Sequence, residues 1–371
     1  MATKFSGLAG FSRTALFAGV AALALPAVAH AQSETDAQAT EEDLADELAA
    51  SNTIVVTATK REQTLQEAPV SVSVTTGETL ERAEIRDLID VQTVTPSLRV
   101  SQLQNSSTTT FIIRGFGNGD NNFGVEPSVG VFIDGVFRSR SAGAIGDLAN
   151  VNRIEVLRGP QSTLFGKNAS AGVVSVITRE PQFDFGGSVS ATYGNFNQFV
   201  LKGDLTGPLT DDLAFAISGG LNKRDGYAEV IGFDEKLNDR NRWNARADLL
   251  FDNGGPLRMR AIGDYSKIDR TGPGQLWTIA RLPSFANPLM AARFGNLASL
   301  GIVPGFDNSK SAEEYESYTS EQNYGASLEV NLGPGDYNLT SITAWRRLDE
   351  GDQRFAIDGS SVPVFTSQQT G

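Results

Sequence analysis

The chain lacks cysteine and nearly lacks histidine: its 371 residues include no Cys and one His, His30. Without Cys there can be no disulfide, thiolate nucleophile, zinc finger or Cys-bound iron–sulfur cluster. His30 lies in a segment that looks like a removable signal peptide, so the mature chain would contain no imidazole. That excludes Ser–His catalysis and removes the commonest ligand of transition metals. We therefore expect no enzyme activity, no catalytic residue, no metal site and no cofactor.

Positive charge and long hydrophobic runs are also scarce. Lys and Arg number 31 against 44 Asp and Glu, a formal net charge of -13. This balance argues against nucleic acid as a partner, because phosphate binding needs clustered cations. No stretch of about 18 apolar residues is present, so any passage through a membrane would be as a β-barrel. The 38 glycines favour turn-rich β structure.

Residues 1–31 are predicted to be a signal peptide. Lys4 and Arg13 form the positive region, residues 15–25 are apolar, and an A-x-A cleavage site ends at Ala31. The alternative is a membrane anchor, but an apolar core this short is poorly matched to the roughly 20 residues that a spanning helix needs. We expect export and cleavage.

Two short segments follow the cleavage site. Residues 32–52 carry acids but no base and no aromatic residue, which is typical of a disordered linker. Residues 53–59, TIVVTAT, are β-prone and precede Lys60 and Arg61. This segment fits either a strand that adds to the sheet edge of another protein or the first strand of the next domain.

Residues 65–182 are predicted to form a compact α+β domain. The pattern indicates a helix at 77–89 and strands at 70–74, 110–114, 128–135, 153–157 and 172–178. The 128–135 strand ends in Asp134-Gly135, a hairpin-turn pair.

Beyond residue 186 the pattern changes to long alternating strands. Trp243, Ala245, Ala247, Leu249 and Phe251, for example, alternate with polar residues. Such segments of about ten residues, with aromatics near their ends, are typical of transmembrane barrel strands around a wet lumen. Short turns at 207–208, 253–256 and 333–336 interleave with long loops near 224–241 and 268–320. A soluble sandwich would also alternate, but it has no reason to sort loops by length.

Glycine-rich stretches suggest phosphate or calcium sites, but the details do not fit. Residues 159–167, GPQSTLFGK, have the wrong glycine spacing for a P-loop, and residues 114–124 lack the strand–helix context of a dinucleotide turn. Residues 117–122 lack the terminal Glu of an EF-hand loop. We expect an exposed loop tip there.

Four motifs in order resemble those of one family. They are TIVVTATKR at 53–61, IRGFG at 113–117, SVGVFIDGV at 128–136 and RIEVLRGPQSTLFGKNASAGVVSVITREP at 153–181. Between a signal peptide and barrel strands, this succession resembles TonB-dependent outer-membrane receptors. The resemblance implies a plug domain at 65–182 followed by an antiparallel transmembrane β-barrel from 186–371, 22-stranded when complete.

The resemblance also implies partners. Residues 53–61 would include the TonB box, which pairs in the periplasm with TonB and its inner-membrane energising complex; its residues would be Thr53, Ile54, Val55, Val56, Thr57, Ala58 and Thr59. The other partners would be outer-membrane lipid of a Gram-negative bacterium and an extracellular ligand, most often a ferric siderophore. An oligosaccharide or cobalamin ligand is the alternative, and a secreted β-rich enzyme is a remote one.

Particular residues follow from the same resemblance. Arg114 and Arg158, with Glu155 beside the second, would seat the plug against acidic groups of the barrel, unless they are ordinary exposed strand-end residues. Ligand-facing residues at the plug apices would be Gln102, Gln104, Asn105, Asn118, Asp120, Asn121 and Asn122. Seven strands are visible where a plugged lumen goes with about 22, so we expect the sequence to be an incomplete receptor.

Overall fold

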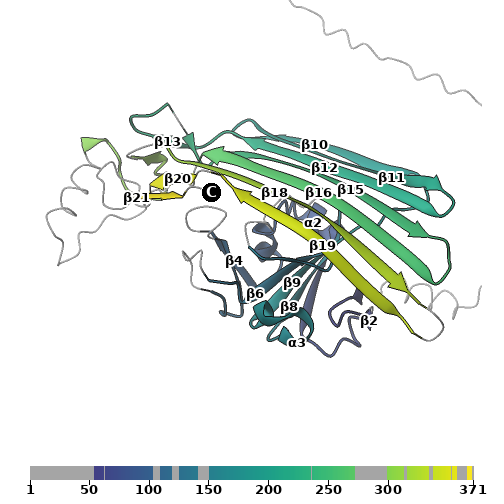
Figure 1. The fold of residues 1–371 in the computed structure, drawn as a ribbon. Coiled ribbons are helices and arrows are strands. Elements are labelled where there is room, and N and C mark those ends of the chain that lie inside the picture. The colour runs from purple at the N-terminus through teal and green to yellow at the C-terminus, as the bar shows by residue number, and fades with distance from the viewer. Residues whose placement is uncertain are drawn as a thin grey trace, which may run out of the picture. The chain divides into compact units, whose positions relative to one another are not determined.

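The computed structural model describes residues 54–61, 63–102, 109–118, 125–140, 150–234, 236–271, 299–312, 316–333, 337–351, 353–356 and 366–369. The predicted signal peptide, the acidic linker and Thr53 lie outside these residues. The described part has two main components, an α+β plug and a curved antiparallel sheet beside it (Figure 1). This arrangement confirms the predicted fold class, while the domain boundaries stay predictions.

The plug is built on a five-stranded sheet in the order β3-β8-β9-β6-β7. The strands are β3 (Val72–Thr76), β6 (Val129–Ile133), β7 (Val136–Arg138), β8 (Val151–Arg158) and β9 (Gly172–Thr178). Asp134 and Gly135 join β6 to β7 with φ values of 47° and 74°, the two positive angles that the predicted Asp-Gly hairpin turn requires. A separate hairpin pairs β4 (Leu98–Gln102) with β5 (Thr109–Ile113).

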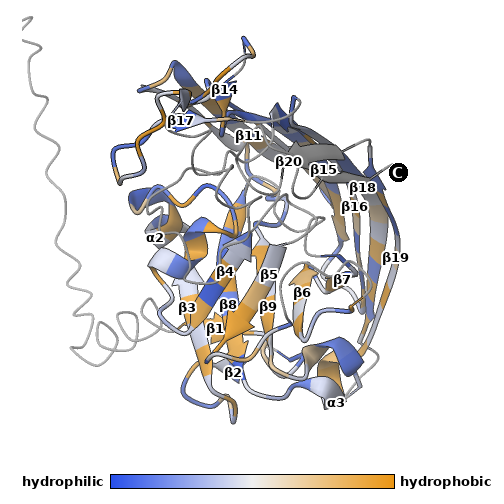
Figure 2. Ribbon diagram, turned by 90° about the vertical axis from the view of Figure 1, so that its left-hand side faces the viewer, coloured by the Kyte–Doolittle hydropathy of each residue, from blue (hydrophilic) through white to orange (hydrophobic). Residues whose placement is uncertain are grey.

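Alternation along the plug strands divides its hydrophobic residues between two faces of the sheet (Figure 2). Ile154 and Val156 of β8 belong to one cluster, which also includes residues of β4 and β5. Leu157 belongs to a second cluster with Val56 and Ala58 from the start of the described chain. The first strongly β-prone segment of the sequence therefore packs on the plug.

The plug helices are short. Helix α2 (Gly77–Arg82) begins after Thr76, whose hydroxyl accepts a hydrogen bond from the Thr79 backbone, and it ends before Glu84 at φ 51°. The predicted helix at 77–89 was therefore too long, because this left-handed residue cannot continue a right-handed helix. The others are η1 (Asp90–Thr93), α3 (Ser162–Phe165) and η4 (Lys167–Ala169). In the described part of the chain, none is a helix that could cross a bilayer.

Seven long strands form what we call the wall sheet, confirming the predicted number. They are β10 (Gly186–Gly194), β11 (Gln198–Thr210), β12 (Leu213–Arg224), β15 (Arg240–Asp252), β16 (Leu257–Thr271), β18 (Tyr318–Leu332) and β19 (Leu339–Glu350). Each pairs antiparallel with the next in chain order, and the sheet curves along one side of the plug (Figures 1 and 2).

Smaller strands complete the architecture. At one end of the wall sheet, β20 (Gln353–Ala356) and β21 (Thr366–Gln369) extend it beyond β18. Three short strands from two long connections form a separate sheet: β13 (Ala228–Val230), β14 (Lys236–Leu237) and β17 (Lys310–Ser311).

One predicted turn was misplaced. Gly207 and Pro208 lie inside β11, opposite Phe215 and Ala214, and the chain turns at residues 211–212. A register shift follows Pro208, and such a bulge tolerates a residue that has no N–H to donate. The predicted short turn at 253–256 is confirmed between β15 and β16.

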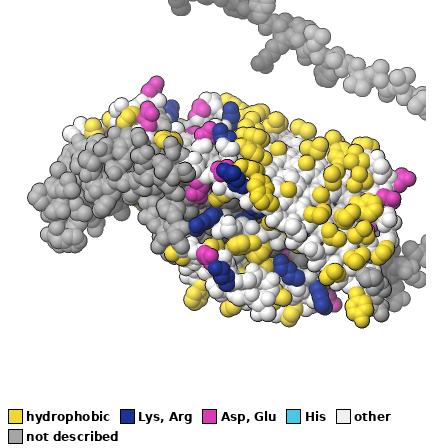
Figure 3. All heavy atoms as spheres, in the orientation of Figure 1, with side chains coloured by type: hydrophobic (Ala, Val, Ile, Leu, Met, Phe, Trp, Pro, Cys, Tyr) yellow, Lys and Arg dark blue, Asp and Glu magenta, His cyan; other side chains and the backbone are white. Residues whose placement is uncertain are grey.

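The outward face of the wall sheet is apolar, with an aromatic row across four strands. Trp243 stacks on Tyr265 at 4.7 Å between ring centres, Tyr265 lies 6.0 Å from Tyr324, and Tyr324 lies 5.8 Å from Trp345. Figure 3 shows hydrophobic side chains spread over these strands. An apolar band bordered by aromatics is what a lipid-facing barrel surface requires.

Candidate functional site

The predicted TonB box is docked on the plug, and we call its described part, residues 54–61, the box segment. Strand β1 (Val55–Val56) pairs with β2 (Gln63–Thr64), so the chain folds back on itself. Val56 and Ala58 are 0% and 1% exposed, whereas Ile54 and Val55 are 39% and 40% exposed. One side of the segment is thus part of the plug core and the other is accessible.

A buried carboxylate holds the middle of the box segment. Glu155, which is fully buried in β8, accepts hydrogen bonds from the Thr57 backbone N–H at 2.9 Å and from the Thr57 hydroxyl at 3.3 Å. Arg153 Nε donates to the same carboxylate at 2.8 Å. Because charge-assisted hydrogen bonds are stronger than neutral ones, the Glu155 carboxylate holds Thr57 in its docked position.

An aromatic pair holds the end of the box segment. Lys60, at φ 63°, places its ammonium 4.3 Å from the ring centre of Phe165 and 5.0 Å from that of Phe132. The two rings contact each other edge to face at 5.1 Å. This cation–π contact is independent of Glu155, so the segment has two anchors besides its buried side chains.

Charge pairs join the plug to the wall sheet. Arg242 of β15 bonds Asp87 of the plug at 2.6 Å, and both side chains are buried. Arg246 of the same strand bonds Asp134 in the β6–β7 turn at 2.6 Å. The wall supplies the arginines here and the plug supplies the carboxylates.

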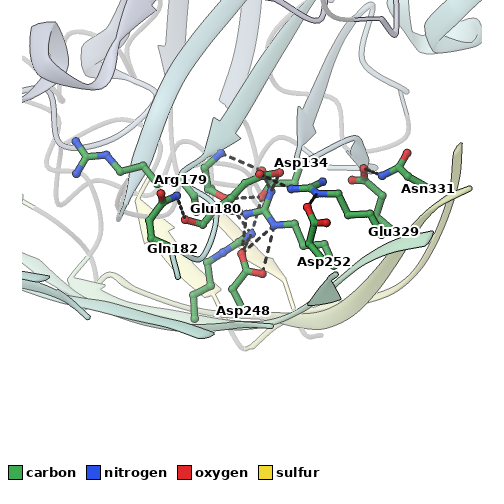
Figure 4. Close-up of polar contacts among 12 residues, drawn as sticks. Asp134, Arg179, Glu180, Gln182, Asp248, Asp252, Glu329 and Asn331 are labelled. Atoms are coloured by element: carbon green, nitrogen blue, oxygen red, sulfur yellow. Dashed lines mark hydrogen bonds and ion pairs between the residues drawn. The ribbon is translucent and has the colours of Figure 1, made fainter. Parts of the chain in front are cut away.

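Figure 4 shows the centre of this plug–wall interface. Arg260 of β16 bonds Asp248 of β15 at 2.6 Å and donates to the Thr178 hydroxyl of the plug at 2.9 Å. Asp134 accepts from the Thr178 backbone at 2.9 Å, which ties the turn to the end of β9. Arg258 bonds Glu180 at 2.5 Å beside this cluster. The plug is therefore seated by a connected polar network.

A second part of the interface reverses the polarity. Asp264 of β16 bonds Arg346 of β19 at 2.6 Å and lies 3.9 Å from Arg138 of the plug. Burial, together with repulsion from Arg346, lowers the pKa of the Arg138 guanidinium to about 10. Arg138 therefore remains a cation at neutral pH.

The three predicted seating residues have partners within the plug. Arg114 donates to the Ser71 hydroxyl at 3.2 Å, and Arg158 donates to the Val72 carbonyl at 3.5 Å. Glu155 is brought together with Thr57 of the box segment, as described above. The role of Arg114 and Arg158 in seating stays a prediction.

Two of the predicted ligand-facing residues are described. Gln102 donates to the Thr109 hydroxyl at 3.0 Å and accepts from Arg270 of the wall at 3.3 Å. Asn118 donates to the Glu126 carbonyl. Gln104, Asn105, Asp120, Asn121 and Asn122 lie outside the described residues.

Sequence reasoning missed the residues that form the plug–wall interface. Asp87 and Arg242 are 155 positions apart, and Asp134 and Arg246 are 112 apart. The available signal was weak: Arg242, Arg246 and Asp248 are charged residues on the inward face of an otherwise ordinary barrel strand. Charges that alternate with lipid-facing residues mark a polar lumen but do not name a partner.

A plug domain seated by polar contacts against a curved antiparallel sheet is the arrangement expected of the plug and wall strands of a plugged β-barrel. Residues 64–173 match the family model described as TonB-dependent Receptor Plug Domain. This match confirms the resemblance to TonB-dependent receptors that the motifs predicted, over the plug part of the chain.

Relatives agree with this assignment. The chain is 32% identical over 204 residues to the iron-regulated outer membrane virulence protein of Vibrio cholerae serotype O1, a match covering 50% of this chain and 29% of that protein. It is 33% identical over 198 residues to the vitamin B12 transporter BtuB of Vibrio vulnificus, covering 52% and 30%. The chain thus spans less than a third of these relatives.

A solved structure shares the fold. The ferric yersiniabactin uptake receptor FyuA from Yersinia pestis superposes with a TM-score of 0.65 at 20% identity. The match covers 78% of this chain and 42% of that one. Plug and wall are both included in a match of this extent.

Proposed function

We propose that this chain is the plug and first wall strands of a receptor that imports a ferric siderophore across the outer membrane, with energy supplied through TonB. The observation that carries the proposal is the docked box segment, which has one accessible side and is held by the Thr57–Glu155 hydrogen bond and the Lys60–Phe165 contact. Iron-related names among the similar proteins support a ferric ligand. The vitamin B12 transporter among them supports the alternative of a cobalamin-type ligand.

The mechanism follows from the docking geometry. Ile54 and Val55 are exposed, so the C-terminal domain of TonB can begin strand addition there without first opening the plug. Continued pairing must pull Val56 and Ala58 from the plug and break the Thr57–Glu155 contact. Because that contact is on β8, an interior strand between β3 and β9, a pull on the segment is transmitted into the sheet.

The plug–wall interface suits a domain that has to rearrange. The contacts that Asp134 and Asp87 make with the wall are charge pairs and hydrogen bonds, which water can replace as the plug shifts. Losing one partner alone leaves a buried charge, which is costly. The interface therefore resists small motions and yields to a sustained load. With the box segment facing the periplasm, the load comes from TonB.

Strand addition is tested by replacing Val55 with Pro in the full-length gene. Proline removes the backbone donor that a ladder needs, so ligand uptake should be lost while surface binding of the same ligand is retained. Val55→Thr is the matched control, since it keeps both the N–H and the β-branched shape, and its uptake should be close to wild type. Uptake by the proline variant at the wild-type rate would contradict the proposal.

A further inference from the structure

A row of arginines crosses three neighbouring wall strands at the end opposite the 253–256 turn. Arg224 of β12 lies directly opposite Arg240 of β15. On the other side of β15, Arg242 is opposite Ile268 of β16, so Arg270, two residues further along, reaches the level of Arg240. Thr319 of β18 is in turn opposite Arg270. We call Arg224, Arg240 and Arg270, together with the adjoining Thr319, the arginine row.

The arginine row faces inward. Side chains alternate along β15, and Arg242, two residues from Arg240, bonds Asp87 of the plug. Arg270 itself donates to Gln102 at the end of the plug strand β4. The row thus lies on the face of the wall that contacts the plug, at the end of the wall that carries the long connections. Under the proposed import function, a ligand enters from this end.

Like charges opposite each other on neighbouring strands destabilise a sheet, so the row needs a compensating partner. Among the described residues, carboxylates near the row include Asp87, Asp239 and Glu321. Asp87 is bonded to Arg242, Asp239 accepts from the Thr271 hydroxyl at 2.7 Å, and Glu321 is buried opposite Ile268. Among the described residues, none of Arg224, Arg240 and Arg270 forms an ion pair with a carboxylate: Arg224 donates to the Asn238 carbonyl and Arg270 donates to Gln102.

Donor groups in the row also lack acceptors. Within the described part of the chain, the Nε atoms of Arg224 and Arg270 and the Thr319 hydroxyl are buried without a hydrogen-bond partner. Buried donors are normally satisfied, and each exception calls for an explanation such as an absent ligand. Guanidinium groups without a carboxylate partner, together with unused donors at the same place, are the features of an anion site.

We propose that the arginine row binds the anionic oxygens of the imported ligand, so that the ligand is a negatively charged ferric chelate with carboxylate or catecholate groups. This rests on the proposed import function. Guanidinium groups bind such oxygens in bidentate fashion and stay charged when desolvated. A neutral glycan or a neutral hydroxamate chelate would leave the mutual repulsion of the arginines uncompensated.

The test measures binding to the full-length receptor in outer-membrane vesicles with three iron probes: a ferric tris-catecholate, ferric citrate and the neutral tris-hydroxamate ferrichrome. We expect the receptor to bind at least one anionic probe more tightly than ferrichrome, with an affinity that falls as salt rises. Arg240→Gln and Arg270→Gln should each weaken that binding roughly tenfold or more, the size of one charge-assisted contact. Arg270→Lys should restore part of it.

Lys223→Gln is the matched control, because Lys223 precedes Arg224 on β12 and is exposed on the opposite face. This substitution removes one positive charge at the same end of the wall and should leave the affinity for the anionic probe unchanged. The heat resistance of the barrel should be unchanged or raised in Arg240→Gln, because the substitution removes a pair of like charges on neighbouring strands. A loss of binding in this variant would then not be due to misfolding.

Preference for ferrichrome, absence of binding to both anionic probes, or wild-type affinity in the arginine variants would overturn the anion assignment. These outcomes differ from failure of TonB coupling, which the Val55→Pro variant reports. A receptor that imports a neutral chelate in a Val55-dependent way would keep the proposed function and lose this inference.

Discussion

The two faces of the plug sheet are both buried, yet they are covered by different kinds of structure. One face is closed by helix α2, η1 and the β4–β5 hairpin, which are permanent parts of the domain. The other is closed partly by Val56 and Ala58 of the box segment, which would have to leave in the coupling mechanism proposed above. One face of the sheet is thus covered by elements of the domain itself, and the other face is covered partly by the segment that we propose undocks.

Neighbouring residues of β8 allow the two faces to be compared directly, and here we expect the largest effect. Ile154 and Leu157 are both 0% exposed and belong to opposite clusters. Ile154→Ala should destabilise the whole plug by about 2–5 kcal/mol, because a cavity opens in the permanent core. Leu157→Ala loses similar contacts, but we expect much of its effect to appear as release of the box segment.

Hydrogen exchange of the full-length receptor separates these results. Ile154→Ala should speed exchange across β8 and β9, whereas Leu157→Ala should speed it chiefly at Val55 and Val56. Equal acceleration in both regions by both variants would remove the distinction between a fixed and a removable cover.

The plug–wall interface gives a second, smaller test, because it should hold the sheet in place while the cover leaves. Asp134→Asn keeps the size of the side chain but removes the charge that Arg246 contacts at 2.6 Å. We expect a loss of about 1–3 kcal/mol in plug seating, seen as increased leak of a large antibiotic through the outer membrane.

Arg158→Ala provides the comparison for this test. The sequence motif predicts that Arg158 seats the plug, while its described bond goes to the Val72 carbonyl inside the plug. If the wall arginines and plug carboxylates carry the seating, the leak in Arg158→Ala should be the smaller of the two. A larger leak in Arg158→Ala would restore it as the principal seating residue.

The sequence was informative wherever a feature depends on local pattern. Alternation with period two indicated the seven wall strands, since each needs one face for lipid and one for water. The pair Asp134-Gly135 predicted the turn between β6 and β7, because few other residue pairs adopt two positive φ angles. Helix α2 was predicted too long because the left-handed conformation of Glu84 is not evident from residue type.

The functional contacts were less predictable because they join distant residues. Thr57 and Glu155 are 98 positions apart, and either side chain reads locally as an ordinary member of a β-prone segment. A motif could say that residues 53–59 bind TonB, but not that they first dock on the plug. The arginine row was equally hidden, because only the register of β12 against β15 places Arg224 opposite Arg240.

The hydrogen bonds between Glu155 and Thr57 of the box segment give the smallest predicted effect on stability, and the effect is specific to docking of that segment. Glu155→Gln keeps an acceptor for Thr57 but removes the negative charge, so the docked segment should be weakened by about 1 kcal/mol. The affinity of the ligand-free receptor for the C-terminal domain of TonB should then rise several-fold, because less free energy is spent on undocking.

Lys60→Gln removes the independent cation–π anchor and should raise the affinity for the same TonB domain by a similar or smaller factor. If the two anchors act separately, the double variant should show the product of the two factors. An unchanged affinity in the double variant would mean that the box segment is already undocked before TonB arrives.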